Sequence, residues 1–227
     1  MNIFAISAFG DNPRYIIGAY KQVYLAKHYF PDFEVWLFVD KPERYRLPAK
    51  VIAMPPETNG SFWRFLAGIN HGCIIFRDAD SRISHRELVA TTEWMQSGKR
   101  LHIMRDHERH MNNESIPILA GMFGIRGPWP SASIGPLMDG MNKPFLYNKD
   151  QDFLRNYVYP IMQDDALVHD LDSGWFGESR KTLINPYNWV GQGWDEDDRP
   201  WYANSNEGFN SFDRFSLPES ARFNQYP

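Results

Sequence analysis

Residues 72–84, with the sequence GCIIFRDADSRIS, contain the pattern that decides the fold. An apolar run from Cys73 to Phe76 is followed directly by two carboxylates one residue apart, Asp78 and Asp80. Several apolar residues in a row are typical of a strand that is buried on both faces, as in a parallel sheet covered by helices. The charged residues mark the point where this strand reaches the edge of its sheet.

The chain on both sides of this stretch alternates between strand and helix patterns. A helix is expected at 84–98, with Ser84 and Glu87 as a capping box, and Pro160 is expected to stop or kink the helix that begins at residue 149. The three glycines of 118–127 indicate a close backbone approach or a bulge. This order predicts an α/β fold with a mixed, mainly parallel central sheet flanked by helices. The other expected strands are 2–7, 33–40, 50–55, 72–80, 100–106, 118–127 and 166–170, and the other expected helices are 15–30, 61–70 (capped by Ser61) and 149–162.

Composition excludes several classes of protein. The chain has 227 residues, of which 43% are hydrophobic and 23% charged, as in ordinary globular proteins. Its net charge of −4, without a block of Lys and Arg, argues against binding nucleic acid or an anionic membrane. A single cysteine excludes a disulfide framework. With no signal peptide pattern and no apolar stretch of about 18 residues, we expect no transmembrane segment and a cytoplasmic location, in the host cytoplasm if the gene is viral.

The carboxylate pair suggests a cation site. In an extended chain, residues i and i+2 point the same way and lie about 6 to 7 Å apart, so Asp78 and Asp80 form an oxygen-rich pocket. Mg²⁺ or Mn²⁺ prefers such ligands and keeps positions for water and phosphate oxygens. The ends of parallel strands are also where α/β folds bind ligands, and the small Ala79 permits close approach. The alternative, solvated turn residues flanked by Arg77 and Arg82, stays open.

The arrangement resembles the GT-A fold glycosyltransferases that use nucleotide sugars and carry an Asp-x-Asp motif at a strand end. Residues 61–68 resemble the helix that leads into that motif, and 118–127 the glycine-bearing strand beneath the acceptor. Residues 150–154, DQDFL, resemble the Asp-Gln segment of glycogenin-like retaining enzymes, and 167–170, LVHD, the late strand that often supplies a metal-binding histidine. The resemblance covers most of residues 1–195 and extends to small glycosyltransferase domains of bacteria and large algal DNA viruses.

The resemblance implies a metal-dependent enzyme of glycan biosynthesis, a hexosyltransferase. It would move a hexose or deoxyhexose from a UDP-sugar to a sugar hydroxyl of a carbohydrate acceptor, with retention favoured over inversion. Mn²⁺ or Mg²⁺ would be the cofactor. A GT-A domain is expected at 1–195, with 196–227 as an extension or linker that wraps it, possibly followed by further domains. The implied donor-binding residues are Ser7, Ala8, Phe9, Arg64, Asp78 and Ala79, the metal ligands are Asp80, Asp78 and His169, and the catalytic candidates are Asp152, Asp150 and Gln151.

Each assignment has a structural alternative. His169 could be a structural histidine paired with Asp170, and Arg64 could make a surface ion pair. Asp150 and Asp152 also suit the start of a helix, where the dipole favours carboxylates. Residues 7–9 could form a simple turn after the first strand. Arg14 and Arg77 are weaker candidates than Arg64 for a place near the diphosphate.

Two other functions remain open from the sequence. A phosphotransferase of the haloacid dehalogenase type also uses Asp-x-Asp, but the resemblance would place the pair after the first strand, whereas here it follows the fourth. A catalytically weak carbohydrate- or nucleotide-binding domain could keep the fold without turnover. The polar residues of 102–110 are expected to line the donor-sugar or acceptor pocket, or to form a polar surface loop; zinc is disfavoured because no cysteine lies nearby.

Overall fold

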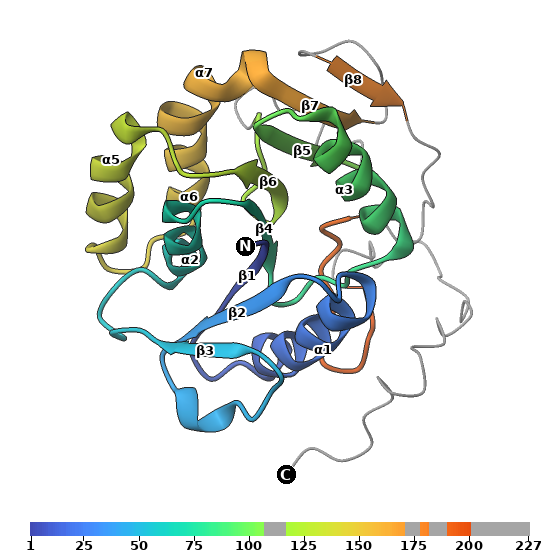
Figure 1. Ribbon diagram of the computed structural model, residues 1–227. Helices are drawn as coiled ribbons and strands as arrows, with labels where there is room; N and C mark the ends of the chain where they lie inside the picture. Colours follow the sequence, from blue (N-terminus) through green and yellow to red (C-terminus); the bar gives the residue numbers. More distant parts are fainter. Residues whose placement is uncertain (107–116, 171–177, 182–189, 201–227) are drawn as a thin grey trace, which may run out of the picture.

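The computed structural model describes residues 1–106, 117–170, 178–181 and 190–200. In these ranges the chain forms an eight-stranded sheet in the order β3-β2-β1-β4-β6-β5-β7-β8, flanked by helices (Figure 1). Strand β6 pairs antiparallel with β4 and β5, whereas every other pair in the sheet is parallel. The mixed, mainly parallel sheet expected from the sequence is confirmed.

The strands and helices have the following bounds. The strands are β1 Ile3–Ala8, β2 Glu34–Val39, β3 Lys50–Ala53, β4 Cys73–Asp78, β5 Leu101–Arg105, β6 Met122–Arg126, β7 Ala166–Asp170 and β8 Glu178–Lys181. The helices are α1 Pro13–Tyr29, α2 Gly60–Trp63, α3 His85–Ser97, α5 Ser131–Met141, α6 Lys149–Phe153 and α7 Tyr159–Met162. The tighter or wider helical turns are η1 Pro42–Arg44, η2 Arg64–Ile69, η3 Leu154–Val158 and η4 Gln163–Asp165.

Two apolar cores cover the two faces of the sheet. Along β4, Ile74 and Phe76 lie in one core, with Phe62 of α2 and Phe153 of α6. Cys73 and Ile75 lie in the other core, with residues of α1 and α3. The alternation follows from the two-residue period of a strand. Figure 1 shows α1 and α3 on one side of the sheet and α2, α5 and α6 on the other.

Two local predictions at helix starts were wrong. Helix α2 begins after Asn59, whose side chain accepts a hydrogen bond from the backbone N–H of Ser61, so Asn59 and not Ser61 is the cap. Ser84 does precede α3, but its side chain makes no capping bond. Glu87 instead pairs with buried Arg77, with 2.6 Å between Oε1 and Nε. An ion pair between α3 and β4 therefore replaces the expected capping box.

Helix α5 has no counterpart among the elements expected from the sequence. It contains Pro136 and follows a segment with two further prolines, Pro128 and Pro130. In contrast, the expected helix at 149–162 is present as α6, η3 and α7 in direct succession. Its wide π-helical turn, η3, ends two residues before Pro160, as expected where a proline cannot continue the normal hydrogen-bond pattern.

None of the helices in the described ranges has the length and apolar character needed to cross a bilayer.

Candidate active site

The carboxyl end of β4 lies beside that of β1. Ser7 and Asp78 are register partners in these neighbouring parallel strands. The Ser7 hydroxyl accepts a hydrogen bond of 2.8 Å from the backbone N–H of Arg64, at the start of η2. Ser7 therefore fixes the backbone that carries Arg64.

Arg64 is the buried cation of this edge. Its side chain is only 5% exposed and donates from Nη1 to Asp78 Oδ1 at 2.5 Å and to the Arg77 carbonyl at 3.2 Å. Its Nη2 pairs with Asp150 Oδ2 at 3.3 Å. The two carboxylates raise the pKa of Arg64 against the opposing effect of burial. The alternative of a surface ion pair is thus excluded for Arg64, which links two segments 86 residues apart.

Asp78 and Asp80 differ in exposure. The Asp78 side chain is 43% exposed, so one side of it faces solvent. Asp80 is buried, and its Oδ2 accepts a hydrogen bond from Nη2 of buried Arg14 at the start of α1. Burial, followed by repulsion from Asp78, raises the pKa of Asp80. A cation close to both carboxylates would relieve that repulsion.

The turn between the two carboxylates is held by close packing against α1. The Gln22 side chain donates from Nε2 to the Asp78 carbonyl at 3.1 Å and to the Ser81 hydroxyl at 2.7 Å. A Cβ on Gly18 would lie 2.5 Å from the carbonyl oxygen of buried Ala79, so only glycine fits there. Gln22 and Gly18 were not among the sequence candidates, because nothing in a helical pattern shows which positions meet a turn.

Gly121 lies against the Asp78 carboxylate on its other side. A Cβ at Gly121 would be 1.8 Å from Asp78 Oδ2. The close backbone approach expected from the glycines of 118–127 is therefore observed, and it positions the candidate metal ligand.

Asp150 and Gln151 reach this cluster, whereas Asp152 does not. Asp150 is buried, and burial raises its pKa despite the pairing with Arg64. Gln151 Oε1 accepts a 3.2 Å hydrogen bond from the backbone N–H of Ala120, next to Gly121. Asp152 pairs with Lys149 at 2.7 Å and Arg155 at 3.1 Å on the exposed side of its helix, and the Lys149 bond lowers its pKa. Asp152 therefore lies apart from the carboxylate pair, and its catalytic role stays a prediction.

His169 does not lie with Asp78 and Asp80. It is fully buried in β7, three places along the sheet from β4, which corresponds to about 14 Å at the usual strand spacing. Its Nδ1 is 2.9 Å from His102 Nε2, and its Nε2 is 2.9 Å from Glu93 Oε2 of α3. Both ring nitrogens are occupied on the α3 face, so the expected role of His169 as a ligand of the same metal is corrected. The alternative pairing with Asp170 is also not observed; the partners are His102 and Glu93.

Residues 7–9 lead from β1 into the rim of the site. Ala8 is buried, and Phe9 is half-buried. The Phe9 ring lies against Gly60, where a Cβ would be 2.3 Å away, and its centroid is 5.5 Å from that of Trp63. The next residue, Gly10, donates its N–H to Asp40 at 3.0 Å. The segment is an ordered rim with an aromatic side chain, and its role in binding a donor stays a prediction.

Residues 190–200 also contact this edge, although the sequence indicated only that they form loops. The backbone N–H of Trp194 donates to the Asp80 carbonyl at 2.9 Å. Asp198 pairs with Lys21 of α1 at 2.6 Å and with Arg82 at 3.0 Å. Trp194 and Asp198 therefore hold this segment against α1 and the turn that carries Asp80. The expected boundary after 195 stays a prediction, and 201–227 lie outside the described residues, as do 107–110 of the polar segment.

The donor set at this edge fits a hard divalent cation in part. Within the described ranges, no three or more side chains of His, Cys, Asp and Glu are placed together to hold an ion. Asp78 and Asp80 offer two carboxylates, one with an open side, which suits Mg²⁺ or Mn²⁺ that keeps water and phosphate oxygens as its other ligands. The fit is that of a site shared with substrate oxygens.

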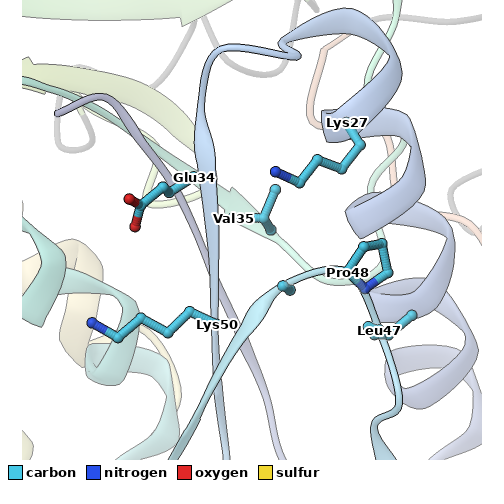
Figure 2. A pocket seen from close by; sticks show the side chains of 7 residues that line it. Lys27, Glu34, Val35, Leu47, Pro48 and Lys50 are labelled. Atoms are coloured by element: carbon cyan, nitrogen blue, oxygen red, sulfur yellow. The ribbon is translucent and has the colours of Figure 1, made fainter.

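A surface hollow of about 410 Å³ lies elsewhere on the molecule. Lys27, Glu34, Val35, Leu47 and residues 48–50 line it (Figure 2). Glu34 and Lys50 begin their strands, so the hollow lies at the amino ends of β2 and β3, opposite the edge that carries Asp78. Lys50 there covers the Trp36 ring at 4.0 Å, and Trp36 donates to Glu34 at 3.0 Å. These contacts account for Glu34 and Lys50 without a ligand.

Comparison with known proteins finds similar structures but no similar sequences. No known protein family and no curated protein sequence matches the chain. The chain is similar to a crystal structure of the galactosyltransferase LgtC in complex with donor and acceptor sugar analogs, with a TM-score of 0.44 and 15% identity over 75% of this chain and 74% of that one. It is also similar to an active-site variant of LgtC, with a TM-score of 0.43 and 14% identity over 75% and 73% of the two chains.

The chain has an α/β fold with a mixed, mainly parallel central sheet, and a likeness at these TM-scores assigns no family to it. The mixed sheet, with β6 alone antiparallel among its strands, and the helices on both faces agree with the fold class expected from the sequence. At this TM-score and identity, the likeness to LgtC assigns no substrate, metal or catalytic residue to this chain. Those assignments depend on the geometry described above.

Proposed function

We propose that this protein is a metal-dependent glycosyltransferase that moves a hexose or deoxyhexose from a UDP-sugar to a hydroxyl group of a carbohydrate acceptor. The observation that carries the proposal is the cluster of three carboxylates and two buried arginines at the carboxyl ends of β1 and β4. Its members are Asp78, Asp80, Asp150, Arg14 and Arg64.

The charge of this cluster argues for a cation. With all five groups ionised, three carboxylates and two guanidinium groups give a net charge of −1. A cluster of that charge repels the diphosphate of a nucleotide sugar. One divalent cation changes the net charge to +1, which attracts the diphosphate and favours the extra charge that develops as the leaving group departs.

Each residue then has a role that its position supports. Asp80 and Asp78 would hold the Mn²⁺ or Mg²⁺ ion, which supplies electrostatic stabilisation of the leaving diphosphate. Arg64 and Arg14, released in part from the carboxylates by the ion, would turn to phosphate oxygens. Asp150, buried and joined to Arg64 by a long bond of 3.3 Å, would accept hydrogen bonds from the donor sugar. Ser7, Ala8 and Phe9 would bind the nucleoside, and Ala79 would leave room for it.

A retaining outcome suits this arrangement better than inversion. An inverting enzyme needs a carboxylate base on the acceptor hydroxyl. Asp152 is engaged with Lys149 and Arg155, and Asp150 is engaged with Arg64. With neither carboxylate placed as that base, the leaving phosphate would take the proton. Analysis of the anomeric configuration of the product tests this point.

The matched pair Asp80→Asn and Asp152→Asn tests the proposal. Hydrolysis or transfer of UDP-sugars with Mn²⁺ is measured together with Mn²⁺ and UDP binding by calorimetry. We expect Asp80→Asn to lose metal binding and turnover, and Asp152→Asn, an equal change on an exposed helix surface, to keep both. Wild-type protein that binds UDP equally well with a chelator would contradict the metal role. Nucleotide binding without turnover would instead favour a binding domain.

The companion pair Asp150→Asn and Asp152→Asn separates the two catalytic candidates of α6. Loss of turnover with little loss of UDP affinity is expected for Asp150→Asn, because Asp150 is to contact the sugar and not the nucleotide. If Asp152→Asn is the variant that loses turnover, the original prediction for Asp152 holds and the role given to Asp150 is wrong.

A further inference from the structure

The loop between α5 and α6 exposes an unusual run of large apolar side chains. Residues 142–149 are all exposed. Within them Phe145, Leu146 and Tyr147 are 53%, 57% and 76% exposed. Exposure of three successive large apolar side chains to water is unfavourable, so a loop that only connects two helices is expected to carry polar residues there.

Phe145 lies on the rim of the candidate active site. Its ring centroid is 5.5 Å from that of Phe9, and Phe9 in turn lies 5.5 Å from Trp63. Phe9 follows Ser7 by two residues, and Ser7 holds the backbone of Arg64. The contact therefore joins the exposed loop to the segment that leads out of the charged cluster.

Both ends of the loop are fixed while its middle is loosely held. The Met141 carbonyl accepts a 2.9 Å hydrogen bond from the N–H of Asn59, and the Asn148 carbonyl accepts one of 3.0 Å from Asp152. Asn148 has a left-handed backbone, with φ of 65°. At its first residue the loop continues the helix, with Asn142 donating to the Met138 carbonyl at 3.0 Å; beyond it, among the described residues, the one backbone hydrogen bond to residues 143–147 is from Lys149 to the Leu146 carbonyl, at 3.4 Å. A short segment of this kind can swing on its ends.

The charge of the loop indicates which part of a donor it would meet. Residues 144–147, Pro-Phe-Leu-Tyr, carry no charge and offer nothing to a diphosphate, which belongs at Arg64 and Arg14. Flat aromatic rings match the face of a nucleobase, and such stacking contributes about 1–3 kcal/mol per base. The ring of Phe145 occupies the place where a base would stack on Phe9.

We propose that residues 142–148 form a lid over the nucleobase of the donor, with Phe145 as its contact. The lid opens at Asn148 and Met141, the base takes the place of Phe145 on the Phe9 ring, and Phe145 closes on the exposed side of the base. Because the loop leads directly into α6, closure also brings Asp150 and Gln151 into register with the bound donor. This inference rests on the proposed function, and its test is arranged so that the two can fail separately.

The test compares Phe145→Ala with Tyr157→Ala, which removes an exposed aromatic ring (45% exposed) from η3. Binding of UDP and of inorganic pyrophosphate is measured by calorimetry on the full chain with Mn²⁺, with ADP and GDP as parallel arms. We expect Phe145→Ala to weaken the nucleotide that binds wild-type protein by about ten-fold, which corresponds to about 1.4 kcal/mol. Pyrophosphate affinity stays unchanged in both variants, and Tyr157→Ala behaves as wild type.

Three results would overturn the lid. If Phe145→Ala binds the nucleotide as tightly as wild type, the lid is refuted while the proposed function stands. An equal loss for nucleotide and pyrophosphate would show a general disturbance of the site in place of base contact. If wild-type protein binds neither nucleotide nor pyrophosphate with Mn²⁺, the proposed function fails, and the lid fails with it.

Discussion

Replacing Gly121 by alanine tests how the candidate metal ligand is positioned. The new Cβ would lie 1.8 Å from Asp78 Oδ2, whereas ordinary van der Waals contact begins at 3.4 Å. One of the two groups must therefore move by about 1.6 Å. Gly121 is held between a turn, in which Met122 donates to the Leu119 carbonyl at 2.9 Å, and the pairing of Met122 with Arg77. The Asp78 side chain, which is part exposed, is the group that moves.

The size of the effect follows from the bond that this movement breaks. A shift of about 1.6 Å lengthens the 2.5 Å contact between Asp78 and Arg64 beyond hydrogen-bond range. Hydrogen bonds to charged groups contribute about 1.5–3 kcal/mol, and Arg64 stays buried without that partner. We expect a loss of about 2 kcal/mol in the free energy of unfolding, or about 4–8 °C in Tm for a chain of this size.

Gly135→Ala is the matched control. A Cβ at Gly135, in α5, meets nothing within 4 Å, so alanine should stabilise that helix by up to about 1 kcal/mol. Thermal melts and Mn²⁺ titrations of both variants are compared. Gly121→Ala should lose stability and weaken Mn²⁺ binding by ten-fold or more, while Gly135→Ala loses neither. A Gly121→Ala protein with wild-type stability and wild-type Mn²⁺ affinity would refute the placement of Asp78 described here.

Two further predictions concern buried ionisable groups away from the site. Burial lowers the pKa of His102 well below its usual 6.5, so the unfolded chain binds a proton that the folded chain does not. Stability is therefore lost as pH falls, on the order of 1 kcal/mol between pH 7.5 and 5.5 for this one group. In denaturant melts at the two pH values, the loss in unfolding free energy should be smaller by that amount in His102→Gln than in wild type. Carboxyl groups with raised pKa, such as Glu87, contribute with the opposite sign, but equally in both proteins, so they cancel in this comparison. Equal losses in the two proteins would contradict the prediction. Arg77→Met leaves Glu87 buried without its partner and should cost about 3–5 kcal/mol of unfolding free energy, most of which should be recovered in the double variant Arg77→Met/Glu87→Leu. Arg155→Met, at an exposed ion pair, should cost under about 1 kcal/mol. Similar melts for the two single variants would refute the buried pair.

The sequence was sufficient for strands β1 to β7 and for one edge of the site, whereas β8 was not predicted. Apolar runs such as 73–76 mark buried strands, and charges that follow them mark the carboxyl edge, so Asp78 and Asp80 could be predicted to lie there. Arg64 was expected there only from the family resemblance. Helix α5 could not be predicted, because Pro136 and two glycines weaken its helical pattern, while burial of Leu137 and packing of Gly140 on Phe62 compensate in the folded chain. The Glu87 capping box failed for a related reason. A buried arginine on the neighbouring strand offers a stronger partner than a backbone N–H, and local spacing contains no information about it.

The misplacement of His169 shows how strand alternation decides which side chains can meet. On β4, Phe76 lies in the core shared with α2 and α6, so Asp78 points to that same face, and Arg77 between them points to α3. On β7, Val168 belongs to the same core as Phe76, whereas Leu167 belongs to the opposite one. His169 therefore shares the α3 face with Leu167, where Glu93 and His102 bind it. A motif of the form His-Asp at the end of a strand gives the right edge of the sheet, but the face depends on a register of one residue, and that register turns His169 away from the two carboxylates.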